Sequence, residues 1–169
     1  MSRVRANLIV GKNGMTALAG SSRPLSNPED RKRFHALRRS ASAIAIGGST
    51  FRSEPYAKSP IPLYVSTRGE VLSSANVQFH NLSPLDLVEL ALTENDGVIL
   101  IEGGVNFLDE LIKAEVIDEL NITRVEKDGD GFPFSDEELV RHYRLEKNEK
   151  SGDTFFELWR PRKRLSNRD

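Results

Sequence analysis

The sequence lacks cysteine, and it carries almost no net charge. The absence of cysteine among its 169 residues excludes disulfides, a thiolate nucleophile, Cys-ligated iron–sulfur clusters and thiolate-bound zinc. The 24 Lys and Arg residues nearly balance the 25 Asp and Glu residues, for a formal net charge of -1. That balance argues against a nucleic-acid-binding protein, because such domains are usually basic. The three histidines have no ligand spacing, so we expect no metal site.

Long hydrophobic runs are also missing. No run approaches the roughly 20 residues that span a bilayer, and no signal peptide is visible at the N-terminus. We therefore expect a cytoplasmic protein with no membrane partner. The content of 38% hydrophobic and 29% charged residues is typical of a globular chain. We assign residues 1–161 to one domain and residues 162–169 to a basic, frayed C-terminal tail.

Short apolar runs alternate with helical patterns along the chain. Helices are predicted to begin at Asn27-Pro28, at Ser83-Pro84 and after Gly103-Gly104. Strands are predicted at residues 7–11, 43–46, 60–65, 98–101 and about 120–125, with a hairpin of residues 143–145 and 155–159. This alternation predicts an α/β fold with a mostly parallel twisted sheet, flanked by helices, and a C-terminal antiparallel β-hairpin.

Two glycine pairs follow predicted buried strands, where sheets of this kind bind ligands. Gly103-Gly104 lets the backbone approach a ligand, and the helix that follows favours an anion such as a pyrophosphate. A tight turn without a ligand is the alternative, since no GxGxxG or Walker motif is present. After the second pair, Gly47-Gly48, we expect Thr50 to cap a short helix and donate to a phosphate, although a simple cap is the alternative.

Three segments together resemble a known family. Residues 22–38, 43–50 and 99–120 are similar, in this order, to the reductase domain of riboflavin biosynthesis, which belongs to the dihydrofolate reductase superfamily. The resemblance implies a single dihydrofolate-reductase-like domain, often a homodimer. It also implies NADPH-dependent reduction of 5-amino-6-(5-phosphoribosylamino)uracil to the ribitylamino product. The zinc deaminase domain fused to some of these reductases needs cysteine ligands, so we expect deamination to occur on another protein.

The same resemblance implies roles for particular residues. Ser22, Arg38 and Glu102 would bind the phosphorylated pyrimidine, Arg38 as a bidentate partner of its phosphate. No catalytic side chain is assigned, because hydride chemistry belongs to the cofactor. The positions that would contact NADPH are Val10, Thr50, Ser66, Thr67, Gly103, Gly104, Val105, Asn106, Phe107 and Leu108.

Two alternatives remain open. Asp30 lies four residues before Phe34, where a dihydrofolate reductase keeps its pterin-binding acid, although a first-turn acid favoured by the helix dipole is simpler. Asn13 stands where the riboflavin enzymes usually have Asp, which leaves room for a non-catalytic binding module. The cofactor is open too, because Arg52 and Arg68 could meet the 2′-phosphate of NADPH while Gly48 stands where dihydrofolate reductases place an arginine.

Overall fold

The computed structural model describes residues 3–56, 58–69 and 76–162. The strands are β1 Val4–Val10, β2 Met15–Ala17, β3 Ala43–Gly47, β4 Leu63–Ser66, β5 Val77–His80, β6 Ile99–Ile101, β7 Glu119–Arg124, β8 Gly131–Pro133, β9 Tyr143–Ser151 and β10 Thr154–Pro161. The helices are α1 Pro28–Arg39, α2 Gly48–Ser53, α3 Pro84–Glu94, α4 Val105–Lys113 and α5 Asp136–His142, with a 3-10 turn, η1, at Arg23–Leu25.

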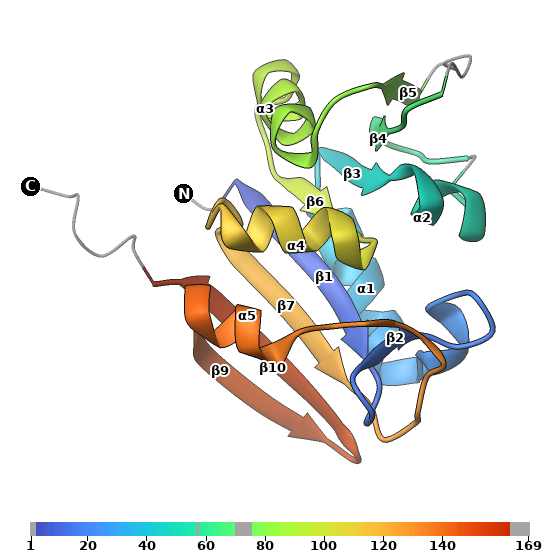
Figure 1. Cartoon of the computed structure of the whole chain (residues 1–169), viewed down its shortest axis with the longest axis vertical. Coiled ribbons are helices and arrows are strands. Elements are labelled where there is room, and N and C mark those ends of the chain that lie inside the picture. The colour runs from blue at the N-terminus through green and yellow to red at the C-terminus, as the bar shows by residue number, and fades with distance from the viewer. Residues whose placement is uncertain (1–2, 57, 70–75, 163–169) are drawn as a thin grey trace, which may run out of the picture.

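An eight-stranded sheet in the order β5-β4-β3-β6-β1-β7-β10-β9 forms the centre of this part of the chain (Figure 1). The pairs from β5 to β7 are parallel, whereas β7 with β10 and β10 with β9 are antiparallel. Helix α1 covers one face of the sheet, and α3, α4 and α5 cover the other (Figure 1). The predicted mostly parallel sheet with a C-terminal hairpin is therefore confirmed.

Two helices begin where their capping residues predict. The side chain of Asn27 accepts a hydrogen bond from the Asp30 N–H at 2.9 Å, and Pro28 opens α1. The hydroxyl of Ser83 likewise accepts from the Asp86 N–H at 3.1 Å before α3. Each cap satisfies an N–H that the helix cannot bond internally. The start of α1 is thus fixed by its own sequence, and the helix leads from there to the amino end of β3.

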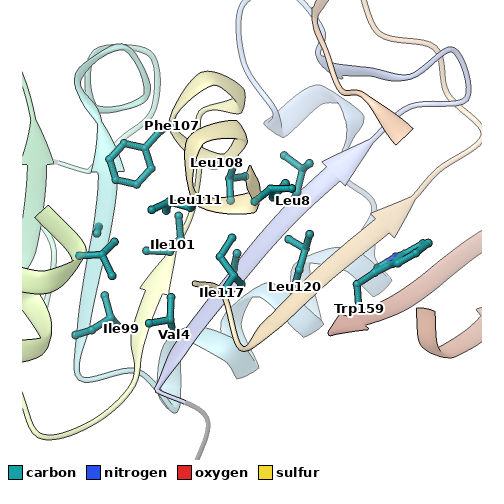
Figure 2. Close-up of a cluster of buried hydrophobic side chains, with 14 of the residues drawn as sticks. Val4, Leu8, Ile99, Ile101, Phe107, Leu108, Leu111, Ile117, Leu120 and Trp159 are labelled. Carbon is teal, nitrogen blue, oxygen red and sulfur yellow. The ribbon is translucent and has the colours of Figure 1, made fainter. Parts of the chain in front are cut away.

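The larger hydrophobic cluster lies between the sheet and helices α3, α4 and α5 (Figure 2). Leu108 and Leu111 of α4 pack against it and are fully buried, as is Ile101 of β6. Burial of one such side chain stabilises the fold by about 1.5–3 kcal/mol. Because α4 is anchored through these residues, its first turn is held rigidly beside the Gly103-Gly104 turn.

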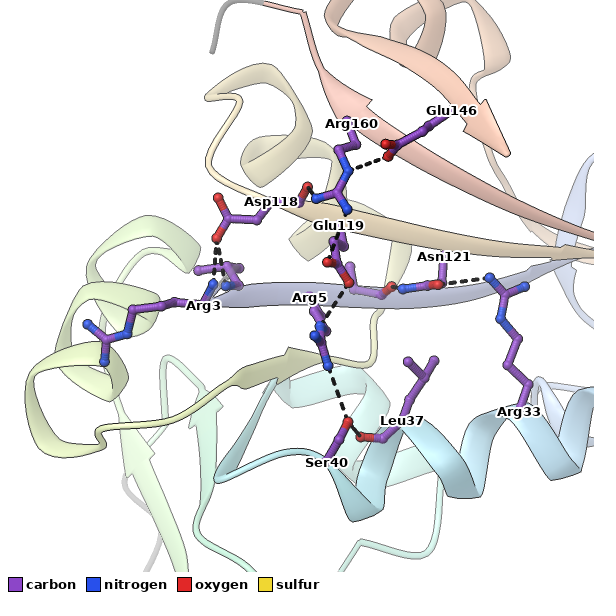
Figure 3. Close-up of polar contacts among 12 residues, drawn as sticks. Arg3, Arg5, Arg33, Leu37, Ser40, Asp118, Glu119, Asn121, Glu146 and Arg160 are labelled. Carbon is purple, nitrogen blue, oxygen red and sulfur yellow. Dashed lines mark hydrogen bonds and ion pairs between the residues drawn. The ribbon is translucent and has the colours of Figure 1, made fainter. Parts of the chain in front are cut away.

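A polar network ties the strands together at the amino ends of β1 and β7 (Figure 3). Arg5 pairs with Glu119 at 2.8 Å, and Glu119 also pairs with Arg160 at 3.3 Å. The carboxylate of Asp118 accepts from the backbone N–H groups of Arg3 and Val4, both at 2.9 Å. These contacts lie at the edge opposite the carboxyl ends of the parallel strands, so we assign them a structural role.

The structure differs from the sequence-based expectations at several elements. Thr50 does not cap α2 but lies inside it, because the helix already begins at Gly48 with Gly47 as its N-cap. Strand β4 begins only at Leu63, after two prolines that restrict the backbone before it. Strand β5, helix α5 and the small antiparallel sheet of β2 and β8 were not predicted from the sequence. Of the predicted basic tail, residues 163–169 lie outside the described residues.

Candidate functional site

A cleft of about 1090 Å³ opens along the carboxyl ends of the parallel strands. Residues 47–50 after β3, residues 66–69 after β4 and residues 102–107 after β6 all line it. The ends of β3 and β6 are the two at which glycine pairs predicted a ligand. The volume lies slightly above the usual range for small-molecule sites, so the cleft is large enough for a ligand with several ring systems.

The Gly103-Gly104 turn forms the middle of the cleft wall. A cis peptide bond joins the two glycines, and Gly103 has a positive φ of 102°. A Cβ atom on Gly104 would lie only 3.0 Å from the Thr50 hydroxyl oxygen. The absence of a side chain therefore keeps a cradle open between this turn and α2. Since α4 starts at Val105, its first N–H groups favour an anion at this point.

Arg38, Glu102 and Tyr56 form a hydrogen-bonded triad beside the turn. The Arg38 Nε and Nη2 atoms donate to the two oxygens of Glu102 at 2.8 and 2.7 Å. The Tyr56 hydroxyl donates to Glu102 Oε2 at 2.5 Å. The Glu102 side chain is only 2% exposed, against 31% for Arg38. The two oxygens of Glu102 are thus both engaged, and the triad holds the end of β6 against α1.

Burial and charge act on the acid–base behaviour of this triad. Burial raises the pKa of Tyr56 well above its usual value, and the negative charge of Glu102 raises it further. Burial alone would lower the pKa of Arg38, but its hydrogen bonds to Glu102 and the charge of that residue outweigh burial and raise it. The triad therefore keeps a charged arginine, while the phenol of Tyr56 stays protonated.

This pairing changes the role that the sequence suggested for Arg38. The guanidinium edge that would make a bidentate contact with a phosphate is already bound to Glu102. Four other arginines, Arg23, Arg31, Arg52 and Arg68, line the cleft. None of these four forms an ion pair within the described ranges. They are the free cations of the cleft.

A second polar cluster brings Ser22 to Glu54. The backbone N–H and the hydroxyl of Ser22 both donate to Glu54 Oε1 at 2.9 Å, and the Ser21 hydroxyl donates to it at 3.0 Å. All three residues line the cleft. Sequence reasoning did not assign Glu54, because residues 54–62 have no periodic pattern that would place it.

Asn7 and Asp30 line the cleft from β1 and α1. The Asn7 side-chain oxygen is buried and has no hydrogen-bond partner within the described residues. Asp30 is 6% exposed, and its Oδ2 atom accepts from the Ser26 hydroxyl. Asn7 was not assigned from the sequence, although a polar residue directly before the apolar run of residues 8–10 was a usable signal. Both side chains present acceptor oxygens at this end of the cleft, and that of Asn7 is unused.

The structure brings most, but not all, of the expected site residues together. Ser22, Arg38, Thr50, Ser66, Thr67 and residues 102–107 line the cleft. Val10 and Leu108 do not, because both side chains are fully buried in the hydrophobic cluster on the α4 side of the sheet. Within residues 3–56, 58–69 and 76–162, no group of His, Asp and Glu side chains could hold a metal ion, and no helix is long and apolar enough to cross a membrane.

Comparisons with known proteins bear on the family and on the fold. The sequence model of the RibD C-terminal domain matches residues 4–127. A dihydrofolate reductase from Enterococcus faecalis, complexed with NADP(H) and RAB-propyl, is 18% identical, with a TM-score of 0.74 over 95% of this chain and 96% of that one. This similarity confirms the dihydrofolate-reductase-like fold.

A second solved structure has two activities in its name. It is a diaminohydroxyphosphoribosylaminopyrimidine deaminase/5-amino-6-(5-phosphoribosylamino)uracil reductase from Thermotoga maritima, 18% identical with a TM-score of 0.74. The alignment covers 95% of this chain but only 56% of that protein, so the present chain spans little more than half its length. Comparison with the curated proteins found no match.

Proposed function

The chain belongs to the RibD C-terminal domain family, and we propose that it is an NADPH-dependent reductase. Its proposed substrate is 5-amino-6-(5-phosphoribosylamino)uracil, which is reduced to the ribitylamino product. The observation that carries the proposal is the cradle between Gly104 and Thr50, because it sits at the helix start and strand ends where a dinucleotide fits.

The residues around the cradle fit NADPH. A Cβ atom on Gly104 would fill the space beside the Thr50 hydroxyl, and the first turn of α4 offers N–H groups to a pyrophosphate. Ser66 and Thr67 line the cleft at the end of β4. When bound, NADPH supplies the hydride. The chain itself has to hold the two reactants in contact and exclude water.

The other end of the cleft would bind the substrate. The free Asn7 oxygen accepts a hydrogen bond from an N–H group of the pyrimidine, which relieves the cost of a buried, unpaired acceptor. Arg31, whose guanidinium lies 4.9 Å from the centre of the Phe34 ring, is free to pair with the phosphate. The Arg38–Glu102–Tyr56 triad then acts as the rigid wall behind the substrate rather than as its phosphate clamp.

Turnover tests this function most simply. The purified protein is incubated with NADPH and 5-amino-6-(5-phosphoribosylamino)uracil, and in parallel with dihydrofolate, while the absorbance of the reduced nicotinamide is followed. We expect consumption of NADPH with the pyrimidine only. If a folded sample consumes NADPH with neither compound, the alternative of a non-catalytic binding module is favoured instead.

One observation favours a second candidate function, that of a dihydrofolate reductase. Asp30 is a buried carboxylate that lines the cleft, and only the Ser26 hydroxyl donates to its side chain among the described groups. A dihydrofolate reductase would use Asp30 to anchor the pterin. This candidate predicts tight methotrexate binding that the Asp30→Asn variant loses, together with turnover of dihydrofolate. Weak methotrexate binding to the unmodified protein excludes it.

The homodimer that the family resemblance implies and the cytoplasmic location that the sequence led us to expect are part of the proposal and stay predictions. Light scattering of the purified protein tests the first, with a mass of about twice 18.9 kDa as the expected result. Fractionation of cells that express the protein tests the second.

A further inference from the structure

One aromatic residue of the cleft lies outside the segment that the family model matches. Phe132 of β8 lines the cleft and is 59% exposed, more than any other large hydrophobic residue that the structure describes. The other described residues of the lining lie between Asn7 and Glu110, whereas the family model matches residues 4–127. Family membership therefore assigns no role to Phe132, and its position at the rim of the cleft needs an explanation from this chain.

The backbone of Phe132 is held in an unusual conformation. Its φ of 56° lies in the left-handed region, which a bulky residue rarely adopts. The Thr16 hydroxyl donates to the Phe132 carbonyl oxygen at 2.6 Å, and the next residue but one, Phe134, donates its N–H to the Gly14 carbonyl oxygen at 2.9 Å. The surrounding contacts thus hold the strained residue in place, a situation that is typical of ligand sites.

The strand order locates Phe132 along the cleft. The small sheet of β2 and β8 lies beyond the carboxyl ends of β1 and β7 (Figure 1). The cradle at Gly104 lies on the other side of β1, because it follows β6, which stands between β1 and β3 in the large sheet. Phe132 therefore belongs to the end of the cleft that Asn7 and Thr16 line, the end that would bind the substrate.

A pyrimidine offers two kinds of surface to this end of the cleft. Its edge carries N–H and carbonyl groups, for which the buried, unpaired oxygen of Asn7 is a partner. Its two faces are π surfaces, and an aromatic side chain binds such a face by stacking. Asn7 can serve only the edge, whereas the ring of Phe132 at the rim has the chemistry to cover a face.

We propose that Phe132 packs against a face of the substrate's pyrimidine ring and is a residue that determines substrate specificity in this chain. The inference rests on the proposed function, because a pyrimidine must first occupy the end of the cleft at Asn7. The contact favours a ligand that carries a planar ring over a bare sugar phosphate. Ribose 5-phosphate is the matched probe, since it has the sugar and the phosphate of the substrate but no ring.

The test measures the affinities of four proteins by calorimetric titration with 5-amino-6-(5-phosphoribosylamino)uracil, with ribose 5-phosphate and with NADPH, each added alone. The proteins are the unmodified chain, Phe132→Ala, Phe132→Trp and the control Leu145→Ala. Leu145 is also an exposed hydrophobic residue, but it lies on β9 outside the cleft lining. The emission of the buried Trp159 checks that Phe132→Ala and Leu145→Ala are folded.

We expect Phe132→Ala to bind the pyrimidine about 5- to 150-fold more weakly, which is the range for loss of one aromatic ring stacked on a base. The same variant should bind ribose 5-phosphate and NADPH as the unmodified protein does. Phe132→Trp keeps a ring and should bind the pyrimidine with little loss. Its added tryptophan should also change its emission when the pyrimidine binds, but not when ribose 5-phosphate does. Leu145→Ala should leave all three affinities unchanged.

The outcomes separate this inference from the proposed function. Undiminished affinity of Phe132→Ala for the pyrimidine overturns the role of Phe132 and leaves the reductase proposal intact. An equal loss of affinity for ribose 5-phosphate also contradicts the inference, because that ligand has no ring, and a loss confined to NADPH would place the ring against the cofactor instead. If the folded, unmodified protein neither binds nor reduces the pyrimidine, the inference and the proposed function both fail.

Discussion

Removal of the Arg38 side chain should destabilise the fold strongly. In Arg38→Ala, the carboxylate of Glu102 stays buried, with a side chain only 2% exposed, and keeps one hydrogen bond from Tyr56. Breaking a buried ion pair on one side costs about 3–5 kcal/mol of unfolding free energy. Because Arg38 itself is 31% exposed, water can reach part of the vacated space, so we expect the lower end, about 3 kcal/mol.

Urea unfolding measures this loss through the fluorescence of the buried Trp159. For a slope of about 2 kcal/mol per molar urea, a loss of about 3 kcal/mol lowers the midpoint by about 1.5 M. The control is Arg39→Ala, which removes the neighbouring exposed arginine and should change stability by less than about 0.5 kcal/mol. Glu102→Gln with Arg38→Ala completes a double-mutant cycle that isolates the energy of the pair.

Equal stability of Arg38→Ala and Arg39→Ala would refute this role of the Arg38–Glu102 ion pair. That result would mean that Glu102 is not held by the guanidinium in solution and that Arg38 is free for a ligand. In that case the variant should show a sharply raised KM for the phosphorylated substrate, because Arg38 would then hold its phosphate as the family resemblance implies.

Three further variants probe the cleft and the core. Gly104→Ala places a Cβ atom 3.0 Å from the Thr50 hydroxyl oxygen and should weaken NADPH binding tenfold or more in a titration. The control Gly131→Ala lies outside the cleft lining, where the added atom meets only the Ala17 Cβ at 3.9 Å, and should bind NADPH as the unmodified protein does; equal affinities of the two variants would refute the cradle. Because folding raises the pKa of Tyr56 above 10.0, its contribution to stability is complete below about pH 10 and falls as the pH rises further. In urea unfolding, Tyr56→Phe should therefore lose less stability between pH 9 and pH 11 than the unmodified protein does. Identical losses for the two proteins would refute this. Leu108→Ala should cost about 2–5 kcal/mol on thermal or urea unfolding, whereas a loss below about 1 kcal/mol would show that α4 is not anchored through this residue.

Local signals were enough to predict much of the fold. The caps at Asn27 and Ser83, each followed by proline, located the starts of α1 and α3, because capping depends on neighbouring residues alone. The apolar run of residues 43–46 predicted the buried strand β3, because this signal also lies in consecutive residues. In contrast, α5 was missed although Ser135 caps it and three acids fill its first turn, because seven residues make too short a pattern to stand out.

The sequence predicted where the cleft lies but not which of its side chains pair with one another. Glycine pairs after buried strands located its walls, since strand ends follow from local sequence. The pairing of Arg38 with Glu102 joins residues 64 positions apart, and no local pattern reports such a contact. Val10 and Leu108 were assigned to the cofactor through the family resemblance, but the pleat of β1 and the turn of α4 direct both side chains into the core.

Transfer of a labelled hydride tests the central claim most directly. The protein is incubated with 5-amino-6-(5-phosphoribosylamino)uracil and NADPH that carries deuterium at the transferable position of its nicotinamide, and the product is analysed by mass spectrometry. We predict a ribitylamino product that contains one deuterium. An unchanged substrate, with a folded protein that binds NADPH, would contradict the assignment as a pyrimidine reductase.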